Sequence, residues 1–221
     1  MPSVGLIVIA TGQRYWPYID PVIGSAFRYF LPHDLILFTD DKTGHACWTF
    51  PVVAQGYPME TLHRYHTILD HANVFTSYSH IFYIDVDSLF VAPVGEEILC
   101  DGITATLHAG FREGFGAWET RYESMACVPP VMQKRYYCGG FNGGSREAYL
   151  TMARSIRSGV EADAAAGFMA KWHDESFLNR YLAYHLPAKV LSSNYCFPEP
   201  VFLKHPSAEV KIICLEKSLR P

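Results

Sequence analysis

Short apolar blocks and helix-like segments alternate along the first half of the chain. Val4–Ala10, Leu35–Phe38 and Ile81–Ile84 are the apolar runs, and each is typical of a buried strand. Between them, Tyr15–Phe30 and Met59–His71 carry apolar residues at helical spacing, the first interrupted by two prolines. This alternation favours an α/β fold in which helices flank a mainly parallel central sheet.

The second half of the pattern is less regular at first. Gly102–Gln133 is poor in periodicity and rich in glycine and aromatic residues, which predicts a binding or lid region. Two further helices are then expected. One is capped by Ser145 and runs to about Ser158, with Gly159 as its stop, and one is capped by Asp174 and runs to about His185. Without a repeat or linker, one domain over residues 1–221 is indicated.

Composition removes several classes of function. The 221 residues are 49% hydrophobic and 18% charged with a net charge of −4, so nucleic acid is not an expected partner. No secretion signal and no run of about 20 apolar residues is found, so a cytoplasmic protein without a membrane anchor is expected. Six cysteines without C-x-x-C spacing predict reduced thiols. The aromatic content, 14%, suits either a core or sugar-binding platforms.

Two carboxylates follow the third apolar run. Asp85 and Asp87 are two positions apart, so on an extended segment both point to the same side. Hard oxygen ligands at the carboxyl end of a sheet strand suit Mg²⁺ or Mn²⁺ held together with a phosphate group. A plain strand-end turn is the alternative, since Asp is common there. The fully apolar strand before the pair favours a metal site.

A phosphatase of the haloacid dehalogenase type would also place D-x-D after an apolar strand, with Asp85 as the nucleophile. That motif opens its fold near the amino terminus, whereas four elements precede Asp85 here. No later G-D-x-x-x-D segment is present. This class is the second hypothesis.

Trp172–Ser176 brings an aromatic ring, an imidazole and two carboxylates to the expected start of a helix. The positive helix end favours the ionised form of Glu175, which suits it to stabilise or attack a cation. Trp172 offers a face for a hexose. Asp174 is expected to cap the helix. For His173, a purely structural role is the alternative to a role in binding.

Gly139-Gly140 and Gly143-Gly144 lack the spacing of a nucleotide fingerprint. They indicate either a close approach of the backbone to a ligand or a structural turn.

Taken together, these segments resemble glycosyltransferase family 6, the family of the ABO blood-group transferases and α1,3-galactosyltransferase. The resemblance covers most of the chain, and two of its motifs, W-H-D-E-S-x-L-N and Y-Y-x-G-G-F-x-G-G-S, are specific. The matching stretches are Phe82–Asp87, Thr106–Phe111, Tyr136–Ser145, Trp172–Asn179 and Lys189–Ser192.

The resemblance implies a GT-A fold with a nucleotide-binding part over about residues 1–95 and an acceptor-binding and catalytic part over about 96–221. It implies transfer from UDP-GalNAc or UDP-Gal to a galactoside acceptor, forming an α1,3 linkage with retention and using Mn²⁺, or Mg²⁺ as the alternative. A noncatalytic glycan-binding module stays open as a further hypothesis. The missing Golgi anchor and stem imply a soluble enzyme of microbial or viral type.

The resemblance also assigns roles by position. Glu175 is implied as the catalytic carboxylate, and Asp85 and Asp87 as metal ligands. The implied donor-binding residues are Ala10, Thr11, Tyr15, Arg64, Val86, Cys138, Gly139, Gly140, Asp174, Lys217 and Arg220. The implied acceptor-binding residues are His108, Thr120, Trp172 and His173.

Two positions bear on the choice of substrates. In the family that this chain resembles, the segment after Y-Y shapes the space around the donor's 2-substituent; Gly140 removes side-chain bulk there, and the resemblance therefore favours UDP-GalNAc over UDP-Gal. An acidic residue that binds the acceptor in the family falls here at Pro198, with Glu199 beside it as a substitute.

Overall fold

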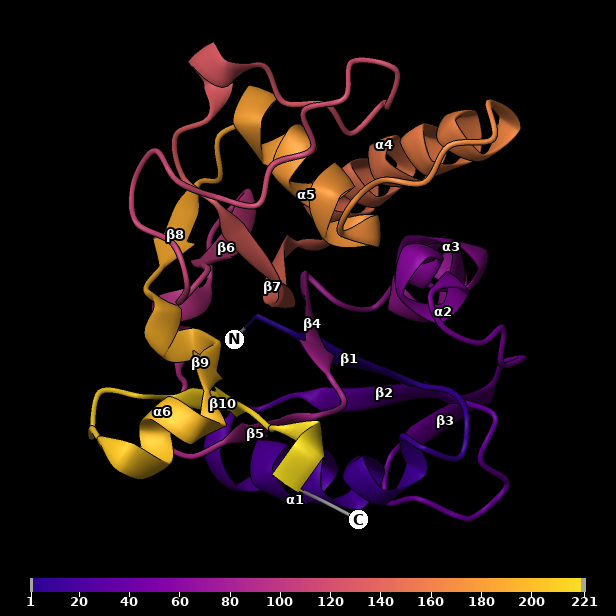
Figure 1. The fold of residues 1–221 in the computed structure, drawn as a ribbon. Coiled ribbons are helices and arrows are strands. Elements are labelled where there is room, and N and C mark those ends of the chain that lie inside the picture. The colour runs from indigo at the N-terminus through magenta and orange to yellow at the C-terminus, as the bar shows by residue number, and fades with distance from the viewer. Residues whose placement is uncertain (1, 220–221) are drawn as a thin grey trace.

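A computed structural model describes residues 2–219 and shows helices packed on both faces of one large sheet (Figure 1). Within these residues, the seven-stranded sheet has the order β3-β2-β1-β4-β7-β6-β8. Its strands are β1 (Val4–Ala10), β2 (Asp34–Thr39), β3 (Trp48–Pro51), β4 (His80–Asp85), β6 (Ile103–Leu107), β7 (Tyr137–Ser145) and β8 (Lys189–Leu191). A smaller sheet has the order β5-β10-β9, from β5 (Ser88–Phe90), β9 (Phe197–Pro198) and β10 (Ile212–Cys214).

The large sheet is mainly parallel, as expected from the sequence. β1 pairs in parallel with both β2 and β4, whereas β7 runs antiparallel to its neighbours β4 and β6. The order reverses at β1, since β2 and β3 lie on one side and β4 on the other. In open α/β sheets, the carboxyl ends of strands at such a reversal form the ligand-binding crevice.

Alternate side chains of β1 reach the two faces of the sheet, and both faces are buried. Ile7 joins the core under the helices α3 and α4, while Leu6 and Val8 join the core under α1. This double burial explains why the strand is continuously apolar. The helices are α1 (Ile19–Tyr29), α2 (Met59–Leu62), α3 (Arg64–Asp70), α4 (Arg146–Ala165), α5 (His173–Tyr184) and α6 (Glu199–Lys204). Of the helices in residues 2–219, none combines the length and the apolar character that crossing a membrane requires.

Several helix boundaries differ from the expectation. The segment after β1 begins as a short 3₁₀ turn, and α1 follows it with Pro21 in its first turn, where a missing N–H is tolerated. The next segment divides at His63 into α2 and α3. α4 does not stop at Gly159 but runs to Ala165, and Gly167, with φ of +71°, supplies the left-handed residue beyond its end.

The role of Asp174 as a cap is also wrong. α5 begins at His173, and Asp174 lies inside its first turn with 2% of its surface exposed. A carboxylate on the buried side of the helix is therefore not available to cap it. The predicted end near His185 is confirmed.

The apolar runs predicted only β1, β2 and β4, and two of the strands that were not expected matter for the site. β6 lies inside the segment that looked irregular, and the glycine-rich segment forms β7, whose residues from Tyr137 to Gly144 are all buried. A Cβ on Gly143 would lie 2.2 Å from Cδ1 of Phe82 on the adjacent β4. These glycines therefore belong to a strand rather than a turn, and close contact with a neighbouring strand explains Gly143.

Candidate active site

A cavity opens at the carboxyl ends of β1 and β4, where the strand order reverses. Residues from both strands, the loop after β1, α2, α3 and the C-terminal segment surround it. They are Ile9, Thr11, Tyr15, Glu60, Thr61, Arg64, Tyr83, Asp85, Val86, Asp87 and Lys217. The D-x-D pair and the predicted donor residues Thr11, Tyr15, Arg64, Val86 and Lys217 thus share one cavity. Ala10 instead packs in the core beneath it.

Asp85 ends β4 and is held by two side chains. Its Oδ1 accepts a hydrogen bond from Arg64 Nη2 at 2.9 Å and one from the hydroxyl of Tyr83 at 2.7 Å. The guanidinium also lies 4.1 Å from the centre of the Tyr83 ring. The second oxygen, Oδ2, faces Gly140, where a Cβ would approach it to 3.0 Å. Asp85 is therefore fixed in orientation by Tyr83 of its own strand and by Arg64 of α3.

Asp87 lies two residues on and pairs with the C-terminal segment. Its Oδ2 is 2.6 Å from Nζ of Lys217, and the same ammonium lies 5.1 Å from the centre of the Tyr15 ring. Burial and the neighbouring Asp85 charge raise the pKa of Asp87, although Lys217 opposes the shift. Two carboxylates in one partly buried wall therefore favour additional positive charge between them.

Arg64 connects the carboxylate pair to the interior. It is 7% exposed and donates from Nη1 to the carbonyl of Gly139 at 2.7 Å. The same Nη1 lies 3.3 Å from Oδ2 of Asp174. Burial opposes the charge of Arg64, but Asp174 and the other acidic groups around it hold the guanidinium pKa well above its ordinary value. Burial raises the pKa of Asp174 to about 7 against the effect of Arg64.

Glu175 lies next to this ion pair and is held on both oxygens. Oε1 accepts the hydroxyl hydrogen of Tyr136 at 2.9 Å, and Oε2 accepts the N–H of Gly139 at 2.8 Å. The position at a helix start led us to expect a favoured ionised form, but burial raises the pKa of Glu175. The two hydrogen bonds lower it again in part, so the local donors, not the helix end, are what support the charge.

The glycines of β7 let these groups approach the backbone closely. A Cβ on Gly139 would lie 3.4 Å from Arg64 and 3.5 Å from Glu175, while one on Gly140 would lie 3.1 Å from the sulfur of Cys196. Cys138 is buried, and hydrogen bonding with Cys138 and Cys214 raises the pKa of the Cys196 thiol. The sequence indicated a close approach of this backbone to a ligand, whereas in the fold the close approach is to the protein's own side chains.

The predicted acceptor residues do not line the cavity and come from three separate places in the chain. His108 packs its ring against Phe111 and Tyr136, with Nδ1 accepting the N–H of Gly110. Trp172 is 48% exposed, as a platform requires. His173 has φ of +48° and lies 5.4 Å, centre to centre, from the Tyr57 ring. Thr120 is exposed beside the ion pair of Glu119 and Arg121.

Some site residues were missed by sequence reasoning. Tyr136 was part of a quoted motif but had no role assigned to it, and Tyr83 was counted as strand core. Glu60 and Thr61 gave no signal, because only the fold brings α2 to the cavity. Tyr83 could have been suspected from its place two residues before Asp85, on the same side of the strand.

Two further expectations concern the C-terminal part. Glu199 does not lie free to receive an acceptor: it is 7% exposed, and its Oε2 accepts the N–H of Glu216. A structural role in holding the segment before Lys217 is therefore the better interpretation. Arg220 lies outside the described residues.

The chemistry of the carboxylate pair fits a divalent cation. Asp85 and Asp87 present hard oxygen atoms to one cavity, and each now balances its charge with a cationic side chain. Among residues 2–219, no group of three His, Cys, Asp or Glu side chains is arranged to hold a metal ion. The remaining ligands would therefore have to come from a bound phosphate group and water.

Comparison with known proteins agrees with this geometry. The family model described as glycosyltransferase family 6 matches residues 2–219. The chain is 43% identical over 119 residues to histo-blood group ABO system transferase 1 of Rattus norvegicus, which covers 52% of this chain and 34% of the relative. It is 31% identical over 222 residues to globoside α-1,3-N-acetylgalactosaminyltransferase 1 of Mus musculus, covering 89% and 61%.

A bacterial protein is similar over most of both chains. The O-antigen biosynthesis glycosyltransferase WbnI of Escherichia coli is 26% identical over 183 residues, covering 81% of this chain and 76% of its own. The chain spans between about a third and two thirds of the length of the two animal relatives named above.

Proposed function

The chain belongs to glycosyltransferase family 6, and on that basis we propose that it transfers a hexose from a UDP-sugar to a galactoside, forming an α1,3 linkage with retention at the anomeric carbon. One observation carries the proposal. A continuous series of contacts runs from Asp85 through Arg64 and the carbonyl and N–H of Gly139 to Glu175. The wall that suits a nucleotide diphosphate is thereby held rigidly against the carboxylate that suits a reacting sugar.

The donor's nucleotide would occupy the cavity at the ends of β1 and β4. Tyr15 offers an aromatic face for the base, and Lys217 places an ammonium between that ring and Asp87. Asp85 and Asp87 would hold Mn²⁺, or Mg²⁺, whose positive charge would stabilise the negative charge that grows on the leaving diphosphate. The net charge of −4 makes such local positive charge necessary for an anionic ligand.

Glu175 does not line this cavity but is joined to it through the Gly139 backbone and Arg64, and it would supply negative charge to the sugar. Its two hydrogen bonds fix both oxygens, so no reorganisation is needed when positive charge develops at the anomeric carbon. Arg64 lies 3.3 Å from Asp174 beside it and opposes, in part, the rise of the Asp174 pKa that burial causes. Together these residues orient the sugar and exclude water from the reacting bond.

For the donor we propose UDP-GalNAc in preference to UDP-Gal. The preference rests on the sequence position of Gly140, which carries no side chain where the family resemblance places the donor's 2-substituent. In the fold, Asp85 and Cys196 lie 3.0 and 3.1 Å from where its Cβ would be, so the glycine avoids a clash with them and opens no pocket of its own. Relatives named as N-acetylgalactosaminyltransferase and as galactosyltransferase both match the chain. A competition assay with equal amounts of both donors tests the choice, and a clear preference for UDP-Gal would refute it.

The exposed Trp172 is the proposed platform for the acceptor, and His108 and Thr120, which belong to the segment between β6 and β7, would complete the acceptor site. Galactoside acceptors added to the assay should therefore raise the rate of UDP release. Replacing Trp172 with Ala should raise the acceptor KM more than the donor KM.

The decisive experiment measures UDP release from a panel of UDP-sugars with Mn²⁺, with Mg²⁺ and with EDTA. We expect Asp87→Ala to lose metal-dependent release, while Asp101→Ala, which removes an exposed carboxylate before β6, keeps it. Full activity in EDTA would refute the assignment of Asp85 and Asp87 as metal ligands. Hydrolysis of p-nitrophenyl phosphate without any UDP release would instead establish the phosphatase. Glycan binding with neither reaction would establish a binding module.

A further inference from the structure

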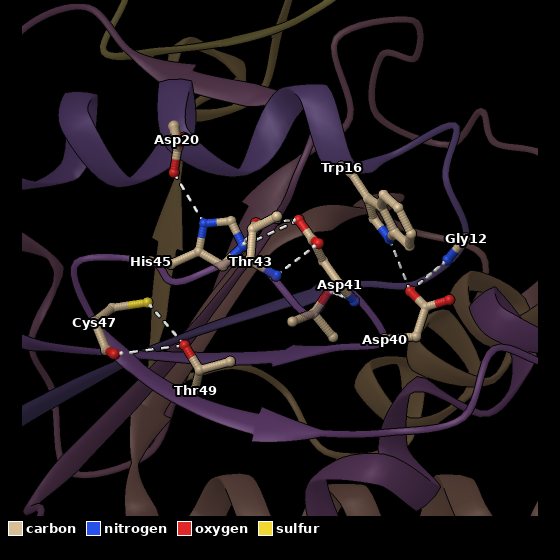
Figure 2. Close-up of polar contacts among 10 residues, drawn as sticks. Gly12, Trp16, Asp20, Asp40, Asp41, Thr43, His45, Cys47 and Thr49 are labelled. Carbon is tan, nitrogen blue, oxygen red and sulfur yellow. Dashed lines mark hydrogen bonds and ion pairs between the residues drawn. The ribbon is translucent and has the colours of Figure 1, made fainter.

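The loop that follows β2 lies against the loop that follows β1, and a carboxylate connects them. Asp40 is the first residue after β2 and is half-buried. Figure 2 shows its side chain between the backbone of Gly12 and the indole of Trp16. Asp40 itself does not line the donor cavity, so its contacts need another explanation than ligand binding.

One oxygen of Asp40 receives both hydrogen bonds. Oδ1 accepts the N–H of Gly12 at 2.8 Å and the Nε1–H of Trp16 at 2.9 Å. Gly12 has φ of +84°, and its carbonyl accepts the N–H of Tyr15 at 2.9 Å, which closes a tight turn. The two bonds to Asp40 therefore fix the start of this turn and the residue just after it.

This turn forms part of the cavity wall. Thr11 precedes Gly12 and Tyr15 precedes Trp16, and both Thr11 and Tyr15 line the cavity. Any rotation of the turn would move the Tyr15 ring relative to Lys217 and Asp87. The Asp40 carboxylate thus acts on the cavity through its neighbours.

The loop that carries Asp40 is in turn fastened to α1. The next residue, Asp41, accepts hydrogen bonds from the N–H and hydroxyl of Thr43 at 3.0 and 2.8 Å. The His45 ring lies between Asp41 and Asp20 of α1, at 3.2 and 3.0 Å (Figure 2). This arrangement gives Asp40 a fixed base from which to hold Gly12 and Trp16.

We propose that Asp40 is a positioning residue for the nucleoside of the donor: it holds the turn at residues 11–16 so that the Tyr15 ring faces the base. This inference rests on the proposed function, because it requires a nucleotide in the cavity. It predicts a selective effect on nucleoside recognition, since the groups proposed to meet the diphosphate, Asp85, Asp87 and Lys217, do not contact Asp40.

The test compares binding of UDP and of inorganic diphosphate, each with Mn²⁺, by calorimetry. Asp40→Ala removes the acceptor of two hydrogen bonds and should weaken UDP binding by about tenfold, while diphosphate binding stays within about twofold of the wild type. Asp40→Asn keeps a carbonyl oxygen at the same place and should restore most of the affinity. Trp16→Phe removes only one donor and should weaken UDP binding by roughly threefold.

Asp101→Ala is the control, because it removes an exposed carboxylate that takes no part in the contacts that hold Asp40, Gly12 and Trp16, and it should leave UDP and diphosphate binding unchanged. In the transfer assay, Asp40→Ala should raise the donor KM and leave kcat and the acceptor KM near the wild-type values. If Asp40 had a purely structural role, Asp40→Ala and Asp40→Asn would both lose affinity for UDP and for diphosphate, and both would have a lower kcat. That result would overturn the proposal.

Equal UDP affinity of Asp40→Ala and the wild type would also overturn it. If Asp40→Ala does not fold, Asp40→Asn and Trp16→Phe decide the question by the same ratio of UDP to diphosphate affinity. If the wild type binds no UDP, the proposed function fails as a whole, which is a different result from a wild type that binds UDP and a variant that binds it equally well.

Discussion

At the scale of single residues, the site is defined by how each carboxylate is partnered. Asp85 and Asp87 face a shared cavity with cations beside them, whereas Glu175 is held by two neutral donors, Tyr136 and Gly139. Ion pairs with Arg64 and Lys217 suit Asp85 and Asp87, because each carboxylate could exchange its cationic side chain for the proposed metal ion. Neutral hydrogen bonds fix a carboxylate while leaving its negative charge available to a substrate.

The hydrogen bond from Tyr136 should be visible in the pH dependence of the reaction. Burial raises the pKa of Glu175, and the Tyr136 hydroxyl lowers it in part. Tyr136→Phe removes the lowering effect, so Glu175 stays protonated to a higher pH. We expect the acidic limb of kcat/KM to move to higher pH in this variant.

The measurement is a profile of kcat/KM between pH 4.5 and pH 9 for both proteins. Tyr137→Phe is the control, since the next residue of a strand points to the opposite face. An unchanged acidic limb in Tyr136→Phe would mean that the bond does not bear on the ionisation of Glu175.

At the scale of elements, β7 decides how close the two halves of the site come. The strand is rich in glycine because β4, Arg64 and Glu175 all approach its backbone. From the sequence, the same glycines indicated a turn or an approach to a ligand, because propensity disfavours glycine in strands. Tertiary contacts outweigh that propensity here, as the Phe82 ring against Gly143 shows.

A pair of glycine substitutions tests this interpretation. Gly143→Ala would place a Cβ 2.2 Å from Phe82 and should destabilise the protein by about 1 to 3 kcal/mol. Gly24 lies on the exposed side of α1 with no atom within 4 Å of such a Cβ, so Gly24→Ala should stabilise it by about 0.5 to 1 kcal/mol. Denaturant unfolding measures both. Equal effects of the two substitutions would contradict the close packing of β7 on β4.

At the scale of the whole molecule, two buried carboxylates anchor the long irregular segment between β6 and β7. Asp163 of α4 accepts hydrogen bonds from Ser124 and from the N–H of Met125. Glu119 accepts the N–H of Lys171, which precedes α5, and pairs with Arg121. The proposed acceptor side is thereby tied to the helix that carries Glu175.

The Glu119 anchor should make part of the stability depend on acid. Hydrogen bonds from Arg121 lower the pKa of Glu119 to about 2, below its ordinary 4.5. The stabilisation is therefore complete above about pH 4.5 and is lost as the pH falls toward 2. Because Arg121 is half exposed, we expect Glu119→Gln to lower the free energy of unfolding by about 1 kcal/mol at pH 7 and by less at pH 3.

Urea unfolding at pH 7 and pH 3 checks this expectation. Glu123→Gln, an exposed carboxylate on the same segment, should show no such difference from the wild type. A Glu119→Gln deficit that is the same at both pH values would show that the ion pair is not its cause.

Local pattern was sufficient for the three central strands of the first half and for singling out the carboxylates that we propose to take part in the reaction. Continuous apolar runs predicted β1, β2 and β4, because strands buried on both faces need no polar positions. The D-x-D pair and the W-H-D-E-S stretch named Asp85, Asp87 and Glu175, because carboxylates at a strand end and in a catalytic motif are recognisable without coordinates.

Only the tertiary structure decided how these residues are brought together. In the fold, β7 lies between β4 and β6, and Asp174 forms a buried ion pair with Arg64 where the sequence predicted a helix cap. The fold also brings Tyr136 to Glu175 and Asp40 to Gly12. Those contacts join positions tens of residues apart, and no local spacing encodes them. The physical reason is that burial and charge compensation depend on neighbours in space, whereas strand and motif signals depend on neighbours in sequence.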